Sequence, residues 1–212
     1  MNRPINLDMS SYKRLQHFKY FKSLAFPYVG ITCDVDITSF YNWTKINNFP
    51  FFLSFLWCIS QAANKVPEFR QRIVGEQIVE YPFCKTSHTV SKDDGTYSYC
   101  LLDYLTDFKK FILNGEEKQL EAKINGNVEE ASDEKESLFF ISTSPWISHT
   151  SIVQPLPIPA DSNPRIIWGK FQLKENIRLI PVSVLCNHAL VDGKHIADFY
   201  KCLDDIMKKV QS

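Results

Sequence analysis

The sequence predicts one domain, spanning residues 1–212, of the α/β or α+β class, with a mixed, largely antiparallel sheet and packed helices. Three observations lead to this prediction. Strand-like and helix-like stretches both occur but do not alternate strictly, which is typical of this class. The 212 residues are 44% hydrophobic and 23% charged, enough for one large core without disulfides. No internal repeat and no linker rich in glycine, serine or proline divides the chain.

The first half of the chain contains one strong strand pattern and one strong helix pattern. Residues 31–37 alternate apolar and polar side chains, as a half-buried strand does. A helix is expected from about Pro50, because apolar residues then recur at helical spacing until Pro67 ends it. Shorter strands are expected at 77–81 and 96–101.

A second helix is expected from 106–108 to about Lys123, followed by three strand-like stretches. The apolar side of this helix is expected to carry Phe108, Phe111, Ile112 and Leu120. The strand-like stretches are 138–142, 165–173 and 178–186. Between the helix and these strands, the acidic run 129–136 is expected to form a solvated loop.

The last helix is expected at 193–210, with Asp192 at the N-cap position and lysines in its final turn. Its apolar stripe is expected to consist of Ile196, Phe199, Tyr200, Leu203, Ile206, Met207 and Val210.

Composition excludes several classes of protein. Lys plus Arg and Asp plus Glu number 24 each, so the formal net charge is zero and argues against a nucleic-acid partner held by bulk charge. The longest apolar run, 49–59, is too short to cross a bilayer, and the N-terminus has no apolar signal core. Six scattered cysteines without a C-x-x-C pair indicate reduced thiols. We therefore expect a cytoplasmic protein with no membrane partner.

One segment, 184–193, carries chemistry. A strand there runs into a turn at His188, and a helix begins just after Asp192 and Gly193. A histidine in that position can act as a general base, or it can simply be bonded to the backbone. Cys186 lies two residues earlier on the same strand face, so a Cys–His nucleophile is conceivable. A metal site built from His188, Asp192 and His195 is a further alternative, although the spacing is not that of a zinc site.

Four segments, taken together, point to a family. The pattern H-x-x-x-D-G begins at His188, and the other three segments are 12–18 (YKRLQHF), 141–146 (ISTSPW) and 164–171, which ends in G-K-F. In this order and at nearly this spacing they resemble the CoA-dependent acyltransferases that share the chloramphenicol acetyltransferase fold. The resemblance covers essentially the whole chain and implies the two-layer fold of that family.

The resemblance implies a role for five residues. His188 would be the general base that takes a proton from an acceptor hydroxyl, so that the oxygen attacks acetyl-CoA without a covalent acyl-enzyme. Ser142 matches the serine whose hydroxyl stabilises the oxyanion. Arg14 would pair with Asp192 to hold the turn in shape, and Gly193 would permit the close turn into the helix.

Binding residues follow from the same resemblance. Lys170 and Phe171 match positions that contact CoA, so acetyl-CoA is expected as a co-substrate, with no tightly bound cofactor and no metal. The positions expected to line the acceptor pocket are Tyr20, Phe21, Tyr97, Tyr99 and Ile167.

Several positions depart from the family pattern. Asn187 replaces the first of two adjacent histidines, while Phe21, Tyr99 and Ile167 change the shape and polarity of the pocket. Family members act as homotrimers with their sites between subunits, and we expect the same here. The expected activity is acetylation of chloramphenicol; acetylation of another hydroxylated small molecule, or a non-catalytic binding module of the same fold, remain alternatives.

Overall fold

The computed structural model describes residues 2–129 and 135–211 and contains two sheets with helices packed against the larger one. Part of the predicted acidic loop, residues 130–134, lies outside the described residues. The helices are α1 (Leu15–Lys22), α2 (Thr38–Ile46), α3 (Phe51–Lys65), α4 (Phe108–Asn125) and α5 (Gly193–Val210), with 3-10 turns at Pro67–Arg70 and Lys135–Ser137. The strands are β1 (Ile5–Asn6), β2 (Tyr28–Asp36), β3 (Gln71–Val74), β4 (Gln77–Glu80), β5 (Lys85–Ser91), β6 (Tyr97–Leu102), β7 (Leu138–Ser144), β8 (Arg165–Gly169), β9 (Gln172–Lys174) and β10 (Ile177–Asn187).

The larger sheet has seven strands, six of them in the order β2-β10-β8-β7-β5-β6, with β9 pairing to β10. The pairs of β7 with β5 and β8 are parallel, and the other pairs in this sheet are antiparallel. A small antiparallel sheet, β1-β4-β3, lies beside it. The predicted mixed, largely antiparallel α/β arrangement is therefore confirmed.

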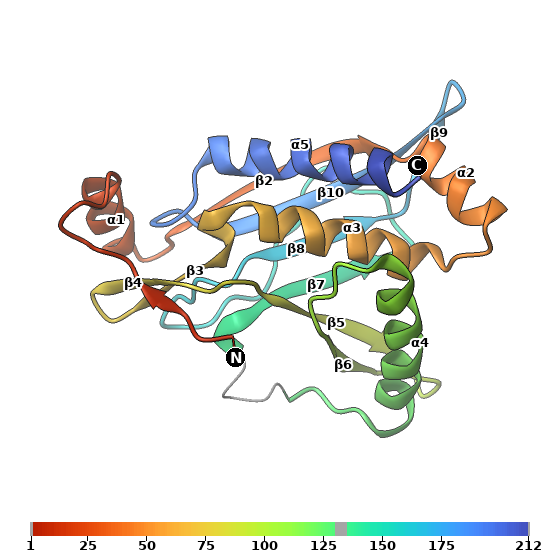
Figure 1. Ribbon diagram of the computed structural model, residues 1–212, viewed down its shortest axis with the longest axis horizontal. Helices are drawn as coiled ribbons and strands as arrows, with labels where there is room; N and C mark the ends of the chain where they lie inside the picture. Colours follow the sequence, from red (N-terminus) through yellow and green to blue (C-terminus); the bar gives the residue numbers. More distant parts are fainter. Residues whose placement is uncertain (1, 130–134, 212) are drawn as a thin grey trace.

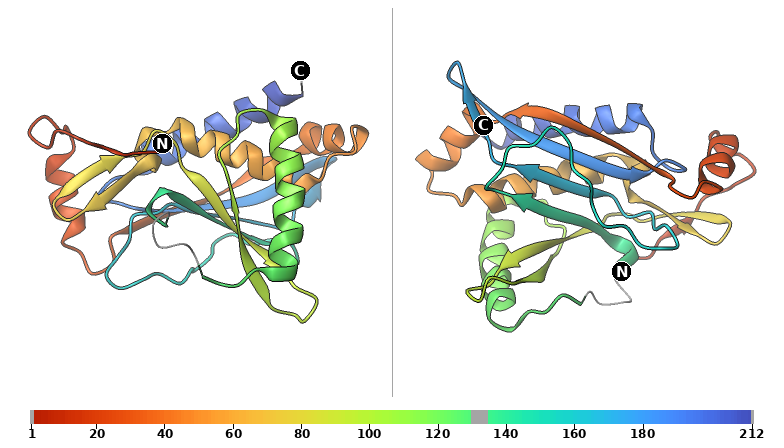
Figure 2. Two further views of the ribbon diagram at one scale, coloured as in Figure 1. Left: turned by 60° about the horizontal axis from the view of Figure 1, so that its bottom comes forward. Right: turned by 180° about the vertical axis from the view of Figure 1, so that it is seen from behind.

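Helices α3, α4 and α5 cover one face of the large sheet, whereas α1 lies beyond its end (Figure 1). Ten of the fifteen residues of α3 are buried, which explains its nearly continuous apolar sequence. Pro50 caps its start, and Pro67 follows its end, as predicted. On the opposite face the segment 145–164, which joins β7 to β8, crosses the sheet (Figure 2, right).

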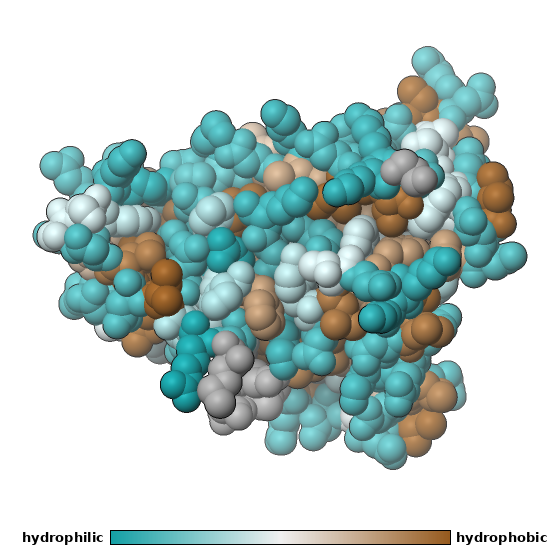
Figure 3. Space-filling view, viewed as in Figure 1, coloured by the Kyte–Doolittle hydropathy of each residue, from teal (hydrophilic) through white to brown (hydrophobic). Residues whose placement is uncertain are grey.

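The stripe predicted for α5 is confirmed, because five of its seven members are buried and Tyr200 and Val210 are half-buried. The prediction for α4 is wrong at one residue. Leu120 is 61% exposed, since it lies nine residues after the buried Phe111, about two and a half helical turns further on and so on the opposite side. Leu113 and Ile124 of the same helix are also exposed, and hydrophobic atoms are visible over α4 in Figure 3.

The stretch 165–173, predicted as one strand, is interrupted in the structure. After Gly169 the backbone leaves the ladder, and the N–H of Lys170 donates to the carbonyl of Ile147 at 2.9 Å instead. Pairing resumes at β9, and the turn into β10 places Glu175 and Asn176 at positive φ of 49° and 70°. This tight turn is the kind that asparagine tolerates.

Candidate active site

His188 lies in the turn just beyond the last residue of β10. Its backbone N–H donates to the carbonyl of Pro27 at 2.7 Å, so the turn is tied to the segment before β2. Its Nδ1 is 2.8 Å from the carbonyl oxygen of Val191. Because a carbonyl only accepts, Nδ1 carries a hydrogen, and in the neutral imidazole the free lone pair is therefore on Nε2. Phe21 stacks on the imidazole, with ring centroids 3.7 Å apart and planes 20° apart.

The turn is held from the other side by an ion pair. Arg14, just before α1, binds the carboxylate of Asp192 through Nη1, and its Nη2 is 3.4 Å from the carbonyl oxygen of His188. Asp192 also caps α5 by accepting from the N–H of Lys194 at 3.0 Å. Burial alone would raise the pKa of Asp192, but His195 and Arg14, together with hydrogen bonds, hold it below its ordinary value. The expected contact between Arg14 and Asp192 is therefore present.

His195 takes part in the same cap. Its Nδ1 accepts from the N–H of Asp192 at 3.1 Å, which completes a capping box at the start of α5. Gly193, in contrast, is not required by sterics. A Cβ placed there would meet no atom within 4 Å, and its φ is outside the left-handed region, so the expected need for glycine in this turn is wrong.

Asn187 contributes contacts that the sequence did not reveal. Its Oδ1 accepts from the N–H of Ala189 at 3.0 Å, and its Nδ2 donates to the backbone oxygen of Asp161 at 2.9 Å. Asp161 in turn holds Arg165 through two bonds of 2.8 and 2.7 Å and accepts from the hydroxyl of Tyr28 at 3.1 Å. Burial and Asp161 raise the pKa of Tyr28 to about 12. No periodic pattern marks Asp161, because it lies in a long loop.

Two alternative roles for this segment lose support. The thiol of Cys186 is fully buried, and that burial raises its pKa well above the ordinary value, so it does not supply a thiolate. Within residues 2–129 and 135–211, no group of three histidine, cysteine or carboxylate side chains is arranged to hold a metal ion. The same residues include no helix that is long and apolar enough to cross a membrane.

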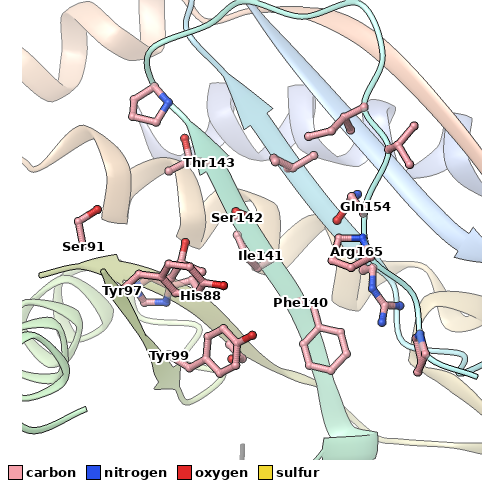
Figure 4. A pocket seen from close by; sticks show the side chains of 18 of the residues that line it. His88, Ser91, Tyr97, Tyr99, Phe140, Ile141, Ser142, Thr143, Gln154 and Arg165 are labelled. Atoms are coloured by element: carbon pink, nitrogen blue, oxygen red, sulfur yellow. The ribbon is translucent and has the colours of Figure 1, made fainter. Parts of the chain in front are cut away.

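A cavity of about 580 Å³ lies on the sheet face opposite the helices, between strands β5–β8 and the segment 145–164. Ser142, on β7, stands in its middle, with Tyr97 and Tyr99 on one side and Gln154 and Arg165 on the other (Figure 4). The lining also includes Ile167, Phe140 and Trp146. The hydroxyl of Ser142 has no hydrogen-bond partner among the described residues.

The register of the sheet separates this cavity from His188. Ser142 pairs with Ile167, and Ile167 pairs with Ser183, so Ser142 is level with Ser183 and two strands away from it. β10 continues from Ser183 to Asn187, and His188 follows it, five positions beyond Ser183. At about 3.3 Å per residue and about 4.8 Å per strand, the two residues are roughly 19 Å apart. One chain therefore brings His188 together with Phe21, and Ser142 together with Tyr97, Tyr99 and Ile167, but does not unite the two groups.

The other predicted residues lie at the margins. Tyr20 is 63% exposed and makes an edge contact with Phe21 at 5.1 Å. Lys170 is exposed in the bend after β8. Phe171 is half-buried, with its ring 5.2 Å from Tyr41 of α2.

Comparison with known proteins gives a consistent result. The family model described as chloramphenicol acetyltransferase matches residues 2–204. A chloramphenicol acetyltransferase from Klebsiella sp. is 28% identical over 202 residues, which cover 90% of this chain and 87% of that protein. Chloramphenicol acetyltransferase 2 from Haemophilus influenzae is 27% identical over 210 residues, or 95% and 98% of the two chains.

Solved structures agree. One described as chloramphenicol acetyltransferase superposes with a TM-score of 0.90 at 25% identity and covers 97% of this chain and all of its own. The Azotobacter vinelandii dihydrolipoamide acetyltransferase shares the fold, with a TM-score of 0.69 at 15% identity over 92% and 86% of the chains. The chain therefore belongs to the chloramphenicol acetyltransferase family and is an acetyltransferase.

Proposed function

We propose that the chain transfers the acetyl group of acetyl-CoA to a hydroxyl of chloramphenicol, with His188 as the general base, and so inactivates the antibiotic. The observation that carries this proposal is the state of the imidazole. Its Nδ1–H is bound to the carbonyl of Val191 at 2.8 Å, and the ring is stacked on Phe21, so Nε2 is left as an oriented proton acceptor.

The reaction needs no covalent enzyme intermediate. Nε2 of His188 takes the hydroxyl proton as the acceptor oxygen attacks the thioester carbonyl, which forms a tetrahedral intermediate. The hydroxyl of Ser142 donates a hydrogen bond to the oxyanion of that intermediate. As the intermediate collapses, the carbon–sulfur bond breaks, and the CoA thiolate leaves with the proton that His188 returns.

We further propose that this site forms between copies of the chain in a homotrimer. The roughly 19 Å between His188 and Ser142 is too long for both to act on one acetyl group inside a single chain. Exposed aromatic side chains support the proposal at both halves. Phe26, next to the Pro27 carbonyl that holds His188, is 63% exposed, and Trp146 at the cavity is 74% exposed.

The remaining partners follow from this chemistry. Lys170 and Phe171, at the bend after β8, are proposed to contact acetyl-CoA, which binds as a co-substrate and leaves as CoA. No tightly bound cofactor and no metal enters the reaction. The whole chain, 1–212, acts as one domain, and the reaction takes place in the cytoplasm, where acetyl-CoA is produced.

One observation favours a second candidate acceptor. Ile167 puts an apolar side chain in the cavity, and Tyr97 and Tyr99 put two phenol rings there. A different hydroxylated small molecule, acetylated by the same steps, is therefore the alternative to chloramphenicol.

The proposal is tested by following CoA thiol release with acetyl-CoA and chloramphenicol. We expect turnover by the unaltered protein and none above background by His188→Ala, which should still bind acetyl-CoA normally because binding does not need the base. Ser142→Ala should be slower by about 10²–10³-fold. No thiol release with chloramphenicol, but release with another alcohol, would select the second candidate. No release with any alcohol in a broad screen would leave a non-catalytic binding module.

A further inference from the structure

The segment 145–164 forms one wall of the cavity but contains no helix or strand. Ile152, Val153 and Gln154 of this segment line the cavity. A loop of this length keeps a defined wall only if something fixes it to the scaffold. Its contacts with the sheet therefore decide how well the cavity is formed before a ligand enters.

His149 makes the first of these contacts. Its Nε2 is 3.1 Å from the hydroxyl of Ser183 on β10, and that hydroxyl is 2.7 Å from the hydroxyl of Thr32 on β2. Ser183 at the centre of this chain of hydrogen bonds is buried, and Thr32 and His149 at its ends are half-buried. The loop is thus tied to two neighbouring strands of the large sheet.

The second contact joins the loop, two residues before His149, to Gly169 and Lys170 at the end of β8. The N–H of Lys170 donates to the carbonyl of Ile147 at 2.9 Å. A Cβ at position 169 would lie 2.7 Å from Nδ1 of His149 and 2.7 Å from the oxygen of Ile147, closer than such atoms come. Glycine at this position therefore lets the loop lie directly on the end of β8.

We propose that His149 is a positioning residue for the acceptor: its bond to Ser183 latches the loop to the sheet and so preforms the wall at Ile152–Gln154. His149 is not among the residues that line the cavity, so it acts through the loop and not on the substrate. Without the latch the loop must be ordered when the acceptor binds, and that cost lowers affinity. The kinetic part of this inference rests on the proposed function.

Three variants test the latch. His149→Phe keeps a ring over Gly169 but removes the hydrogen bond, His149→Gln restores a polar atom near the position of Nε2, and Ser151→Ala is a matched control at an exposed position of the same loop. Amide exchange is measured by mass spectrometry on the intact protein. We expect faster exchange in His149→Phe at Lys170 and across the loop, and exchange like that of the unaltered protein in the other two.

Steady-state kinetics with chloramphenicol gives the second measurement. His149→Phe should raise KM for chloramphenicol by about five- to tenfold, the effect of one lost hydrogen bond, while kcat and KM for acetyl-CoA change by less than about twofold. Unchanged exchange in His149→Phe, or a loss confined to kcat, overturns the latch. If the unaltered protein does not acetylate chloramphenicol, the proposed function fails, and the exchange comparison alone decides the latch.

Discussion

Complementation between two strongly impaired variants tests whether the catalytic residues come from different chains. His188→Ala removes the base and keeps Ser142, and Ser142→Ala removes the hydroxyl and keeps the base. The sheet register puts these residues roughly 19 Å apart in one chain, so neither variant can repair itself. A mixed assembly can, because an intact His188 of one copy can face an intact Ser142 of the next.

The expected magnitude follows from the symmetry. In a closed ring of three copies, each interface joins the His188 side of one copy to the Ser142 side of its neighbour. Whether the mixed trimer holds one or two copies of either variant, one of its three interfaces contains both intact residues. The mixed trimers should therefore show about one third of the rate of the unaltered enzyme.

The assay uses the two variants co-expressed with different affinity tags and purified in tandem, so that only mixed assemblies are measured for CoA thiol release. Each variant alone, carried through the same tags, sets the background. Mixed trimers that remain at background would refute the shared site, because a site contained in one chain gives no rescue. Assemblies that are not trimers would contradict the ring on which the fraction depends.

Three further predictions concern the stability and shape of the scaffold. Burial lowers the pKa of His88 to about 4, against 6.5 when it is exposed. The unfolded chain therefore takes up the proton first, and the free energy of unfolding falls by about 3 kcal/mol as pH falls from 6.5 toward 4. Urea titrations across that pH range should show this loss of stability in the unaltered protein and not in His88→Gln. Arg72 is 1% exposed and donates to the carbonyls of four residues, among them Leu138 at 2.9 Å. Arg72→Met should therefore lower the free energy of unfolding by about 3 kcal/mol or more. A urea midpoint near that of the unaltered protein would contradict this. Arg14→Lys keeps a positive charge for Asp192 but loses the contact with the backbone of the His188 turn. We therefore expect kcat to fall by up to about 10²-fold, with KM for acetyl-CoA unchanged. A normal kcat would show that the ion pair does not shape the turn. Because the pKa of Asp192 is lowered, its contribution to stability is present above its ordinary value of 3.8 and is lost as pH falls through the value in the folded protein.

The elements that were predictable from sequence are those whose local pattern and packing agree. The apolar run of α3 between Pro50 and Pro67 belongs to a helix buried on nearly all sides, and the stripe of α5 faces the sheet. Strand β5 escaped prediction because its sequence, KTSHTVS, is polar, although its first half is largely buried between β6 and β7. Helix α1 escaped because it is short and buries only Phe18. One of the two partners of β5, the parallel strand β7, lies far away in the sequence.

The candidate site likewise has features that could be predicted from the sequence and features that could not. The turn at His188, the cap at Asp192 and the pairing with Arg14 could be expected from local motifs and a family resemblance. The contacts of Asn187 with Asp161, and of His149 with Ser183, could not, because each joins a loop to a strand through one hydrogen bond that leaves no repeating pattern. The separation of His188 from Ser142 required the strand order and register, which local sequence does not determine.

Each half of the proposed site is positioned by contacts within one chain. The imidazole of His188 is held by Val191 and Phe21, and its backbone N–H is bound to the carbonyl of Pro27, all within one chain. The backbone of Ser142 is held by the pairing of β7 with β8, in which Ser142 lies opposite Ile167. Association then has only to align two preformed surfaces, so the entropy of orienting the base and of placing the strand that carries the oxyanion donor is lost in folding and not during each turnover. A divided site of this kind ties catalysis to the assembly, and for that reason variants far from His188 that weaken subunit contacts should lower activity without changing the chemistry.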